Sequence, residues 1–364
     1  MAAIRVLQVS GTFYEMGYQH GQAYLPHIHE LVAERLALCM DEVWTGRRLS
    51  RERVLGLVTA CETAHRAYSP ELYAELEGMA AATGLSVGEL IIAGGFTDFV
   101  DVLYNAEPTP AAPEQAANNC TTFMIGNAYA QKGLGMAGQT WDMHATATPY
   151  VILLHGQPQG LPSFLVFTLT GCPGMIGMNS AGLCVGINNL MGADGVPGVT
   201  WPFVVRKILM QDNLQDALCC ITEAPLAGGH NYFLMDEGGA GYMVEAMSTT
   251  YHIEPLENGI LTHANQCNSN LTCAVERPLT PELMEDSQAR QGRAATLLQR
   301  RPVSPEDLMA LTRDRSDGSF SICSLPEPPY YSQTCGAVIM RPASREFWGV
   351  WGLPSENEYE RFVL

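Results

Sequence analysis

The sequence predicts an α+β protein in which two β-sheets pack face to face between two layers of helices. Helical patterns fill the first hundred residues, and short β-like runs begin at Cys120. Blocks of several strands then alternate with pairs of helices, without the strict β-α-β order of a doubly wound parallel sheet. Because no strong linker interrupts the 364 residues, we expect a single domain over residues 1–364.

The N-terminal helical layer is predicted from capping signals. Three hydroxyl side chains stand where helices should begin, namely Thr12, Ser69 and Ser86. Pro26 is expected to bend or divide the first helical pattern, because proline lacks the N–H group that a helix interior needs. Gly84 is expected to end the helix that begins after Ser69.

Strand-like runs separated by Gly, Pro or Asn follow this layer. The expected strands cover residues 121–125, 150–155, 164–169, 183–188, 231–235, 242–246, 260–263, 338–341 and 347–351. The expected helices of this part cover residues 203–210, 214–222, 282–299 and 305–313.

Composition excludes several classes of function. The formal net charge is −18 and the pI is near 4.8, so tight binding to nucleic acid or to anionic membranes is not expected. The N-terminus lacks the pattern of a secretory signal, and no window reaches the apolar length of a membrane span. These features predict a cytoplasmic protein.

The eleven cysteines lie in apolar segments and form no C-x-x-C pair, which is typical of reduced core residues. Neither they nor the nine histidines have the spacing of zinc ligands. No Walker or dinucleotide glycine motif follows a predicted strand. The sequence therefore predicts neither a metal nor a cofactor.

The most informative segment surrounds Cys120. Residues 105–117 are rich in Pro and Ala and predict an exposed loop, after which Cys120 opens a Thr-rich apolar strand. If the bond between Asn119 and Cys120 is cut, Cys120 gains an α-amino group with an ordinary pKa of about 7.7–8.0. One residue would then hold both a nucleophile and a base, as in an N-terminal-nucleophile hydrolase. The alternative is an ordinary buried strand cysteine.

Two further residues fit this hypothesis. Asp142 is predicted to end the strand after the one that Cys120 begins, so a hairpin would bring its carboxylate beside the Cys120 amine. Asn265 follows an apolar strand, where its amide could face a developing oxyanion. Each is equally compatible with a common turn residue.

Several blocks, in this order, resemble a known family. They are Gly11-Thr12, Glu15 to Gly21, Cys120-Thr121-Thr122, Gly138 to Asp142, Met178 to Gly182, His263-Ala264-Asn265 and Phe320 to Cys323. The family they resemble is that of acyl-coenzyme A:6-aminopenicillanic acid acyltransferase, a group of self-cleaving cysteine N-terminal-nucleophile enzymes. The resemblance implies a four-layer αββα sandwich. It also implies a proenzyme cut into residues 1–119 and 120–364, whose two chains stay associated.

The resemblance also assigns roles. It implies that Cys120 is the nucleophile, that Asp142 supports its amine and that Asn265 is an oxyanion-hole donor. Ser321 matches a serine associated with self-processing. Asn189 falls where the related bile salt hydrolases have another oxyanion-hole asparagine.

Two positions depart from the fungal acyltransferase. Asn119 stands where that enzyme has Gly before its cysteine, and Ser324 stands where it has Arg. Loss of this Arg weakens the case for an acceptor that carries a carboxylate, such as the penicillin nucleus.

The sequence thus predicts an amidohydrolase that cleaves a small N-acyl amine or N-acyl amino acid through a thioester on Cys120. Transfer from acyl-coenzyme A to an amine through the same thioester is the main alternative. A papain-type hydrolase pairing Cys120 with His263 or His230 and a noncatalytic small-molecule binding protein are the others. A homo-oligomer is compatible with each of these.

Overall fold

The computed structural model describes residues 3–106, 120–257, 259–326 and 331–364. In these residues the strands form two sheets, and every neighbouring pair is antiparallel except β1 and β4. The eight-stranded sheet contains, in spatial order, β1 (Val6–Gly11), β4 (Val151–Pro158), β5 (Phe164–Leu169), β6 (Ile176–Asn179), β7 (Cys184–Leu190), β8 (Gly229–Met235), β9 (Gly241–Ala246) and β10 (Tyr251–Pro255). The six-stranded sheet contains β11 (Ile260–His263), β2 (Thr122–Ile125), β3 (Met136–His144), β12 (Ser332–Arg341), β13 (Glu346–Trp351) and β14 (Glu360–Val363).

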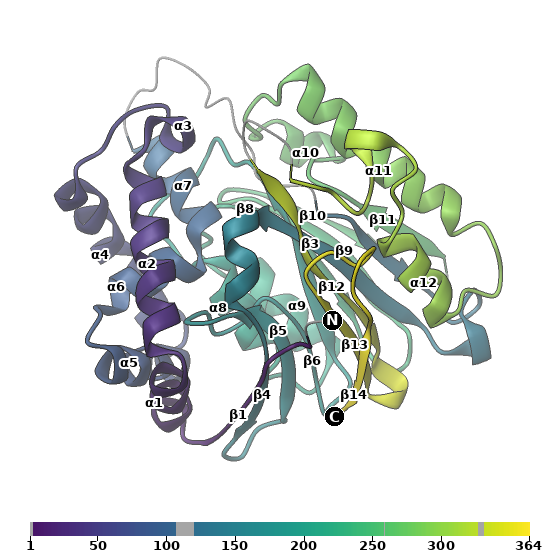
Figure 1. Ribbon diagram of the computed structural model, residues 1–364, viewed down its shortest axis with the longest axis horizontal. Coiled ribbons are helices and arrows are strands. Elements are labelled where there is room, and N and C mark those ends of the chain that lie inside the picture. The colour runs from purple at the N-terminus through teal and green to yellow at the C-terminus, as the bar shows by residue number, and fades with distance from the viewer. Residues whose placement is uncertain (1–2, 107–119, 258, 327–330) are drawn as a thin grey trace.

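Helices cover the outer face of each sheet (Figure 1). The layer on the side of the eight-stranded sheet comprises α1 (Phe13–Ala23), α2 (Leu25–Met40), α3 (Glu42–Thr45), α4 (Arg51–Tyr68), α5 (Pro70–Thr83), α6 (Val87–Gly94), α7 (Phe96–Asn105), α8 (Trp201–Ile208) and α9 (Leu214–Thr222). The opposite layer comprises α10 (Asn270–Cys273), α11 (Pro281–Leu297) and α12 (Pro305–Thr312). The predicted αββα sandwich is therefore confirmed.

The capping signals act as expected. Thr12 closes a capping box at the start of α1, and the chain breaks before α2, which has Pro26 in its first turn. Gly84 ends α5 with a φ of 75°, a left-handed conformation that glycine adopts without a steric penalty.

The expectation that the first hundred residues are all helical is wrong at one place. Val6–Gly11 forms the edge strand β1, which pairs in parallel with β4. The strands β6, β10 and β14 were likewise not predicted from the sequence. These strands are short, and β1, β10 and β14 lie at sheet edges, so their pairing depends on distant partners more than on a local pattern.

A buried glutamine joins the two sheets near the site described below. Gln139 on β3 donates to the carbonyl of Ile187 on β7 at 2.7 Å and accepts from its N–H at 2.6 Å. Because both bonds are buried, they fix the position of β3 against β7.

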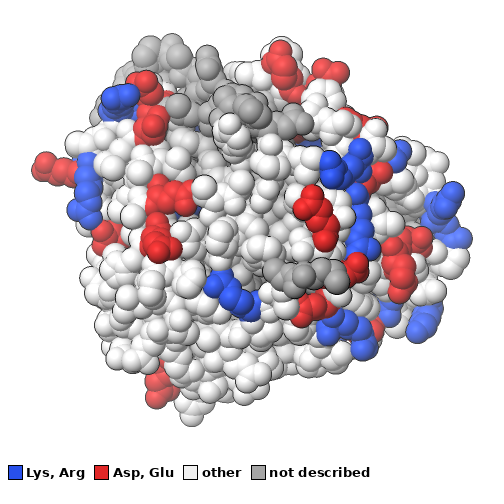
Figure 2. Space-filling model, viewed as in Figure 1, with Lys and Arg blue, Asp and Glu red and all other residues white. Residues whose placement is uncertain are grey.

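All eleven cysteines are free, and all except Cys219 and Cys273 are buried, which confirms that most are core residues. In the described ranges no single helix is long and apolar enough to cross a membrane. The pair α5 and α6 would pass by length and composition, but it is bent by 109°. On the face shown in Figure 2, Lys and Arg side chains are scattered among Asp and Glu and form no continuous stripe.

Candidate active site

Cys120 lies two residues before the start of β2 and is 3% exposed. Its Sγ is 3.4 Å from the backbone nitrogen of Asp142, which donates to it, and 3.9 Å from the Asp142 carbonyl oxygen. The antiparallel pairing of β2 with β3 produces this approach, so the predicted hairpin is confirmed. Asp142 does not end the strand as expected, because β3 continues to His144. Asn119 and residues 107–117 of the predicted loop over residues 105–117 lie outside the described residues, whereas Asn105 is the last residue of α7 and not part of a loop.

The Asp142 carboxyl group is 1% exposed. Its Oδ2 accepts from the Thr334 hydroxyl at 3.0 Å, and its Oδ1 has no hydrogen-bond partner among the described residues. Burial raises the pKa of Asp142 to about 8, against the opposing effects of the Arg290 charge and of the hydrogen bond from Thr334. In the uncut chain this carboxyl is therefore mainly neutral at pH 7.

This raised pKa predicts a pH-dependent stability. The folded state holds the Asp142 proton more tightly than the unfolded state, so the stabilisation is complete below about pH 4 and is lost as the pH rises through about 8. The test compares the Cys120→Ala/Asp142→Asn double variant with the uncut Cys120→Ala parent. As the pH rises from about 5 to about 9, the free energy of unfolding of the double variant should increase relative to that of the parent. We expect a gain on the order of 4 kcal/mol in urea titrations, because about three pH units separate pH 5 from the folded pKa and each is worth about 1.4 kcal/mol. A difference that does not change with pH would contradict this assignment.

Asn265 follows β11 and is 6% exposed. Its Nδ2 donates to the backbone carbonyl of Asn189 at 3.0 Å, and its Oδ1 accepts from Arg290 Nη2 at 3.2 Å. Its backbone N–H donates to the Ser287 hydroxyl at 2.7 Å. The amide predicted to serve an oxyanion hole is thus fixed at both ends within the same cluster as Cys120.

Of the two consecutive asparagines on β7, the side chain that contacts Cys120 belongs to Asn188. Its Nδ2 donates to the Cys120 carbonyl at 3.2 Å, and its Oδ1 accepts from Thr122 at 2.5 Å and from Asn231 at 2.9 Å. Side chains alternate along a strand, so Asn189 points to the other face, where its Oδ1 has no partner among the described residues. Asn189 meets the cluster through its backbone carbonyl.

Arg290 on α11 was not predicted, yet it connects the site. Its guanidinium is fully buried and donates to the carbonyl of Cys120 at 2.7 Å and to Thr121 Oγ1 at 3.2 Å. It also binds Asn265, and Asp286 neutralises it at 2.9 Å from the preceding turn. The one feature of the sequence that could have pointed to Arg290 is its four-residue spacing from Asp286. Such ion pairs also occur on exposed helix faces, so the spacing does not identify a buried arginine.

Ser321 is buried, and its hydroxyl accepts from the Asp317 N–H at 3.1 Å. Among the described residues no hydrogen bond joins it to Cys120 or Asp142. The segment that contains it reaches the site indirectly, because the Ser324 N–H donates to Thr334 Oγ1 at 2.9 Å and Thr334 donates to Asp142. Thr334 was also missed by the sequence analysis, since a single threonine in a strand carries no distinguishing pattern.

The histidines of the papain-type alternative are engaged elsewhere. His263 Nε2 is 3.0 Å from Glu245 Oε1, and His230 Nδ1 is 2.9 Å from Asp98 Oδ1. Neither forms a hydrogen bond to Cys120 in the described part of the chain. The geometry therefore gives the thiol no histidine base.

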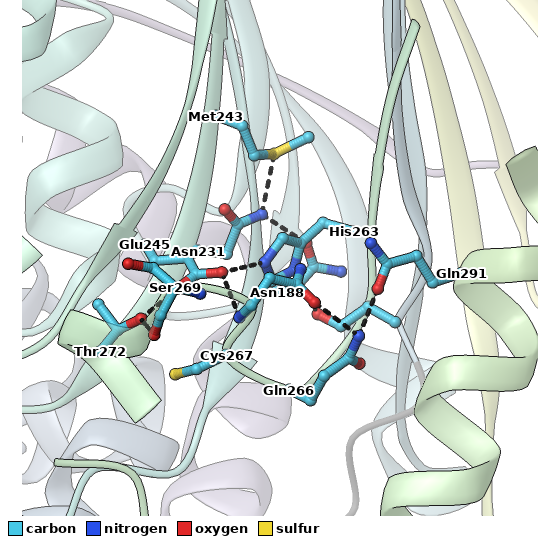
Figure 3. Close-up of polar contacts among 12 residues, drawn as sticks. Asn188, Asn231, Met243, Glu245, His263, Gln266, Cys267, Ser269, Thr272 and Gln291 are labelled. Atoms are coloured by element: carbon cyan, nitrogen blue, oxygen red, sulfur yellow. Dashed lines mark hydrogen bonds and ion pairs between the residues drawn. The ribbon is translucent and has the colours of Figure 1, made fainter. Parts of the chain in front are cut away.

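Glu245 organises the loop that follows Asn265 (Figure 3). Its carboxylate accepts from the N–H groups of Asn268 at 2.7 Å and Ser269 at 3.2 Å and from the Thr272 hydroxyl. Burial pushes the pKa of Glu245 upward, but hydrogen bonds from His263, Thr272 and Asn268 outweigh burial and hold it below its usual range. A charged Glu245 thus fixes the backbone beside Asn265.

The chain is similar to several known proteins. A family model described as acyl-coenzyme A:6-aminopenicillanic acid acyl-transferase matches residues 130–356. The chain is 24% identical over 363 residues to the acyl-coenzyme A:6-aminopenicillanic-acid-acyltransferase 40 kDa form of Emericella nidulans, over 97% of this chain and 94% of that protein.

Similar solved structures include penicillin V acylase from Agrobacterium tumefaciens, with 12% identity, a TM-score of 0.39 and coverage of 64% of this chain and 82% of that one. A variant of conjugated bile acid hydrolase from Clostridium perfringens has 11% identity and a TM-score of 0.40, with coverage of 67% and 97%. The family model spans more than half of the sequence. The chain therefore belongs to the acyl-coenzyme A:6-aminopenicillanic acid acyl-transferase family.

Proposed function

We propose that this protein is an autoproteolytic cysteine N-terminal-nucleophile amidohydrolase, which cleaves a small N-acyl amine or N-acyl amino acid through a thioester on Cys120. One observation carries the proposal: the buried Cys120 thiol lies against Asp142, while Arg290 and Asn188 both donate to the Cys120 carbonyl. Membership of the family supports an enzyme that acts on amide bonds.

The uncut chain lacks an activated nucleophile. Burial raises the pKa of the Cys120 thiol to about 12, with a smaller contribution from Asp142 when that carboxyl is ionised. A thiol in this state is protonated at pH 7 and needs a base to attack a carbonyl. An α-amino group on Cys120 itself would supply that base without a histidine. The unpartnered Oδ1 of Asp142 offers an acceptor for such an amine.

In the proposed processing step, the Cys120 sulfur attacks the carbonyl carbon of Asn119. The peptide C–N bond breaks, the nitrogen takes the thiol proton, and a thioester joins Asn119 to the sulfur. Water then cleaves this thioester, which releases a carboxylate on Asn119 and restores the thiol. The mature residue holds a free amine and a free thiol on the same carbon skeleton.

Turnover would follow the same chemistry. The mature thiol transfers its proton to the α-amino group and attacks the acyl carbon of the substrate, and the amine returns the proton to the leaving nitrogen. Asn265 is suited to donate to the oxyanion. Water, activated by the amine, then hydrolyses the thioester. If a second amine replaces water, the same intermediate gives acyl transfer.

Intact mass spectrometry of the purified protein tests the processing step. We expect two fragments that begin at Met1 and Cys120. They should coelute in native gel filtration, because β1 from the first fragment pairs with β4 from the second and α1 packs on both strands. A fully active single chain would contradict the proposal, and binding of N-acyl compounds without turnover would instead indicate a noncatalytic protein.

Use of acyl-coenzyme A as the donor is the second candidate, since the family and the fungal relative carry that description. The best candidate in the sequence for binding a coenzyme A phosphate is the basic pair Arg206-Lys207, and its contacts do not favour this role. Arg206 is fully buried and pairs with Glu75 at 3.3 Å, and Lys207 donates to the Tyr68 carbonyl at 2.8 Å. Arg206 is therefore not available to bind a coenzyme A phosphate, and Lys207 is already engaged with Tyr68. Detection of the Cys120 thioester after incubation with N-acyl amines and with acyl-coenzyme A compares the two donors.

A further inference from the structure

Arg35 on α2 is a buried cation without a carboxylate partner. It is 1% exposed, and no ion pair involves it in the described residues. The other buried arginines of this part of the chain each face a carboxylate, in the pairs Arg206–Glu75, Arg277–Asp101, Arg290–Asp286 and Arg341–Glu346. A buried guanidinium without an anion is costly, so this exception calls for a cause.

The donors of Arg35 are only partly used. Its Nη1 lies 3.2 Å from His144 Nδ1 and 3.6 Å from the Met143 sulfur, whereas its Nε has no partner in the described ranges. Arginine can only donate, so His144 Nδ1 accepts and the proton of the neutral imidazole lies on Nε2. Burial, followed by the Arg35 charge, lowers the pKa of His144 to about 3. Among the described residues His144 Nε2 also has no hydrogen-bond partner, so two buried N–H groups, Arg35 Nε and His144 Nε2, have no acceptor.

Aromatic rings surround these donors. Trp44 from α3 lies 4.7 Å from the His144 ring and 5.4 Å from the ring of Phe96 on α7, measured between centroids. The Arg35 guanidinium lies 4.8 Å from the Phe96 centroid. We call Arg35, Trp44, Phe96, Met143 and His144 the Arg35 cluster. It joins three N-terminal helices to the end of β3.

One member of the Arg35 cluster, Met143, lies on the same sheet face as the nucleophile. Thr122 on β2 pairs directly with Gln139 on β3, and directly paired residues share one face of a sheet. Alternation then places Cys120 on the same face as Trp141 and Met143, the face that meets the eight-stranded sheet. Met143, which Arg35 touches, is thus one side chain beyond Trp141 on the face that carries the thiol. By the same alternation His144 projects from the opposite face, with Asp142, and Arg35 Nη1 reaches both side chains at the end of β3.

We infer that Arg35 and His144 form the subsite for a carboxylate on the substrate, so that the substrate is an N-acyl amino acid and not an N-acyl amine without an acidic group. This inference rests on the proposed function. A guanidinium and a neutral imidazole N–H can each donate to a carboxylate oxygen, and such charge-assisted bonds are strong when buried. Because the net charge of −18 disfavours anions at long range, a local cation must supply the selectivity.

The test compares matched substrates, each an N-acyl amino acid and its carboxamide, with the processed protein. The wild type should prefer the acid by about 30-fold or more in kcat/KM, mainly through KM. In Arg35→Met the ratio of the two kcat/KM values should fall to near one, and Arg35→Lys should restore part of it. Arg5→Met is a matched control, because Arg5 also lies beside a histidine, His27, and an aromatic ring, but is less buried. It should keep the wild-type ratio.

Two results would overturn the inference: a wild type without preference for the acid, or an Arg35→Met variant that loses activity on both substrates equally. Fragment masses and the melting temperature show whether each variant folds and is processed. If the wild type hydrolyses neither substrate, the proposed function fails. Calorimetric binding of the acid and of its carboxamide then tests whether Arg35 binds a carboxylate. Binding of the N-acyl amino acid that is lost in Arg35→Met supports the subsite. Equal binding of the acid and the carboxamide, or no binding of either, overturns it.

Discussion

Cys120→Ala is expected to yield a single uncut chain without measurable activity. The substitution removes the sulfur that would attack the Asn119 carbonyl and the atom that would carry the acyl group. Both losses act on the same path, so we expect activity to fall by about 10⁴-fold or more. Cys120→Ser should behave in the same way, because a hydroxyl is a weaker nucleophile at neutral pH. Intact mass and a substrate assay measure the two effects on one sample.

Cys335→Ala is the matched control for this experiment. Cys335 is also free and buried, and it lies on β12, the strand next to Asp142. It donates to carbonyls at the end of β3, so its removal should lower the melting temperature slightly and leave cleavage intact. A cut and active Cys120→Ala protein would remove Cys120 from the mechanism.

Arg290→Lys should slow both cleavage and turnover by about 10²-fold while the protein stays folded. Arg290 holds the Cys120 carbonyl and the Asn265 side chain with two different nitrogens. Lysine keeps the positive charge beside Asp286, but its single ammonium cannot reproduce this forked geometry. We expect the loss in kcat more than in KM, because a positioning residue acts on the reacting atoms rather than on the bound substrate.

Arg293→Lys on the same helix controls for general effects of the substitution. Arg293 also forms an ion pair, with Asp314 at 2.9 Å, but it is partly exposed and has no bond to Cys120 or Asn265 among the described residues. It should match the wild type in cleavage rate and kcat. Equal losses in Arg290→Lys and Arg293→Lys would contradict a positioning role for Arg290.

The fold was predictable because its signals are local. Capping residues, Pro26 and Gly84 define helix ends by their own backbone chemistry, and alternating apolar runs define most strands. The hairpin between β2 and β3 follows from two adjacent runs, so the approach of Asp142 to Cys120 could be derived as well. By contrast, β1 depends on a partner about 145 residues away in the chain, which no local pattern reveals.

The site was predictable only in part, for the same reason. Arg290 reaches Cys120 from a helix 170 residues further along, and its local sequence resembles an ordinary charged helix. The choice between Asn188 and Asn189 depends on the register of β7, which a doubled asparagine leaves open until the pairing with β8 is known. Arg35 illustrates the limit most clearly, since a missing partner is visible only when the whole environment of a side chain is known.

The account depends on a sulfur and a free α-amino group acting together on Cys120. The most direct measurement is to quench the working enzyme with acid during turnover, digest it with pepsin at acid pH, where the protonated amine cannot take the acyl group from sulfur, and identify the acylated peptide by tandem mass spectrometry. We predict a peptide that begins at Cys120, with an unmodified α-amino group and the acyl group on its sulfur. An acyl group on another residue, or on a Cys120 still joined to Asn119, would contradict the account.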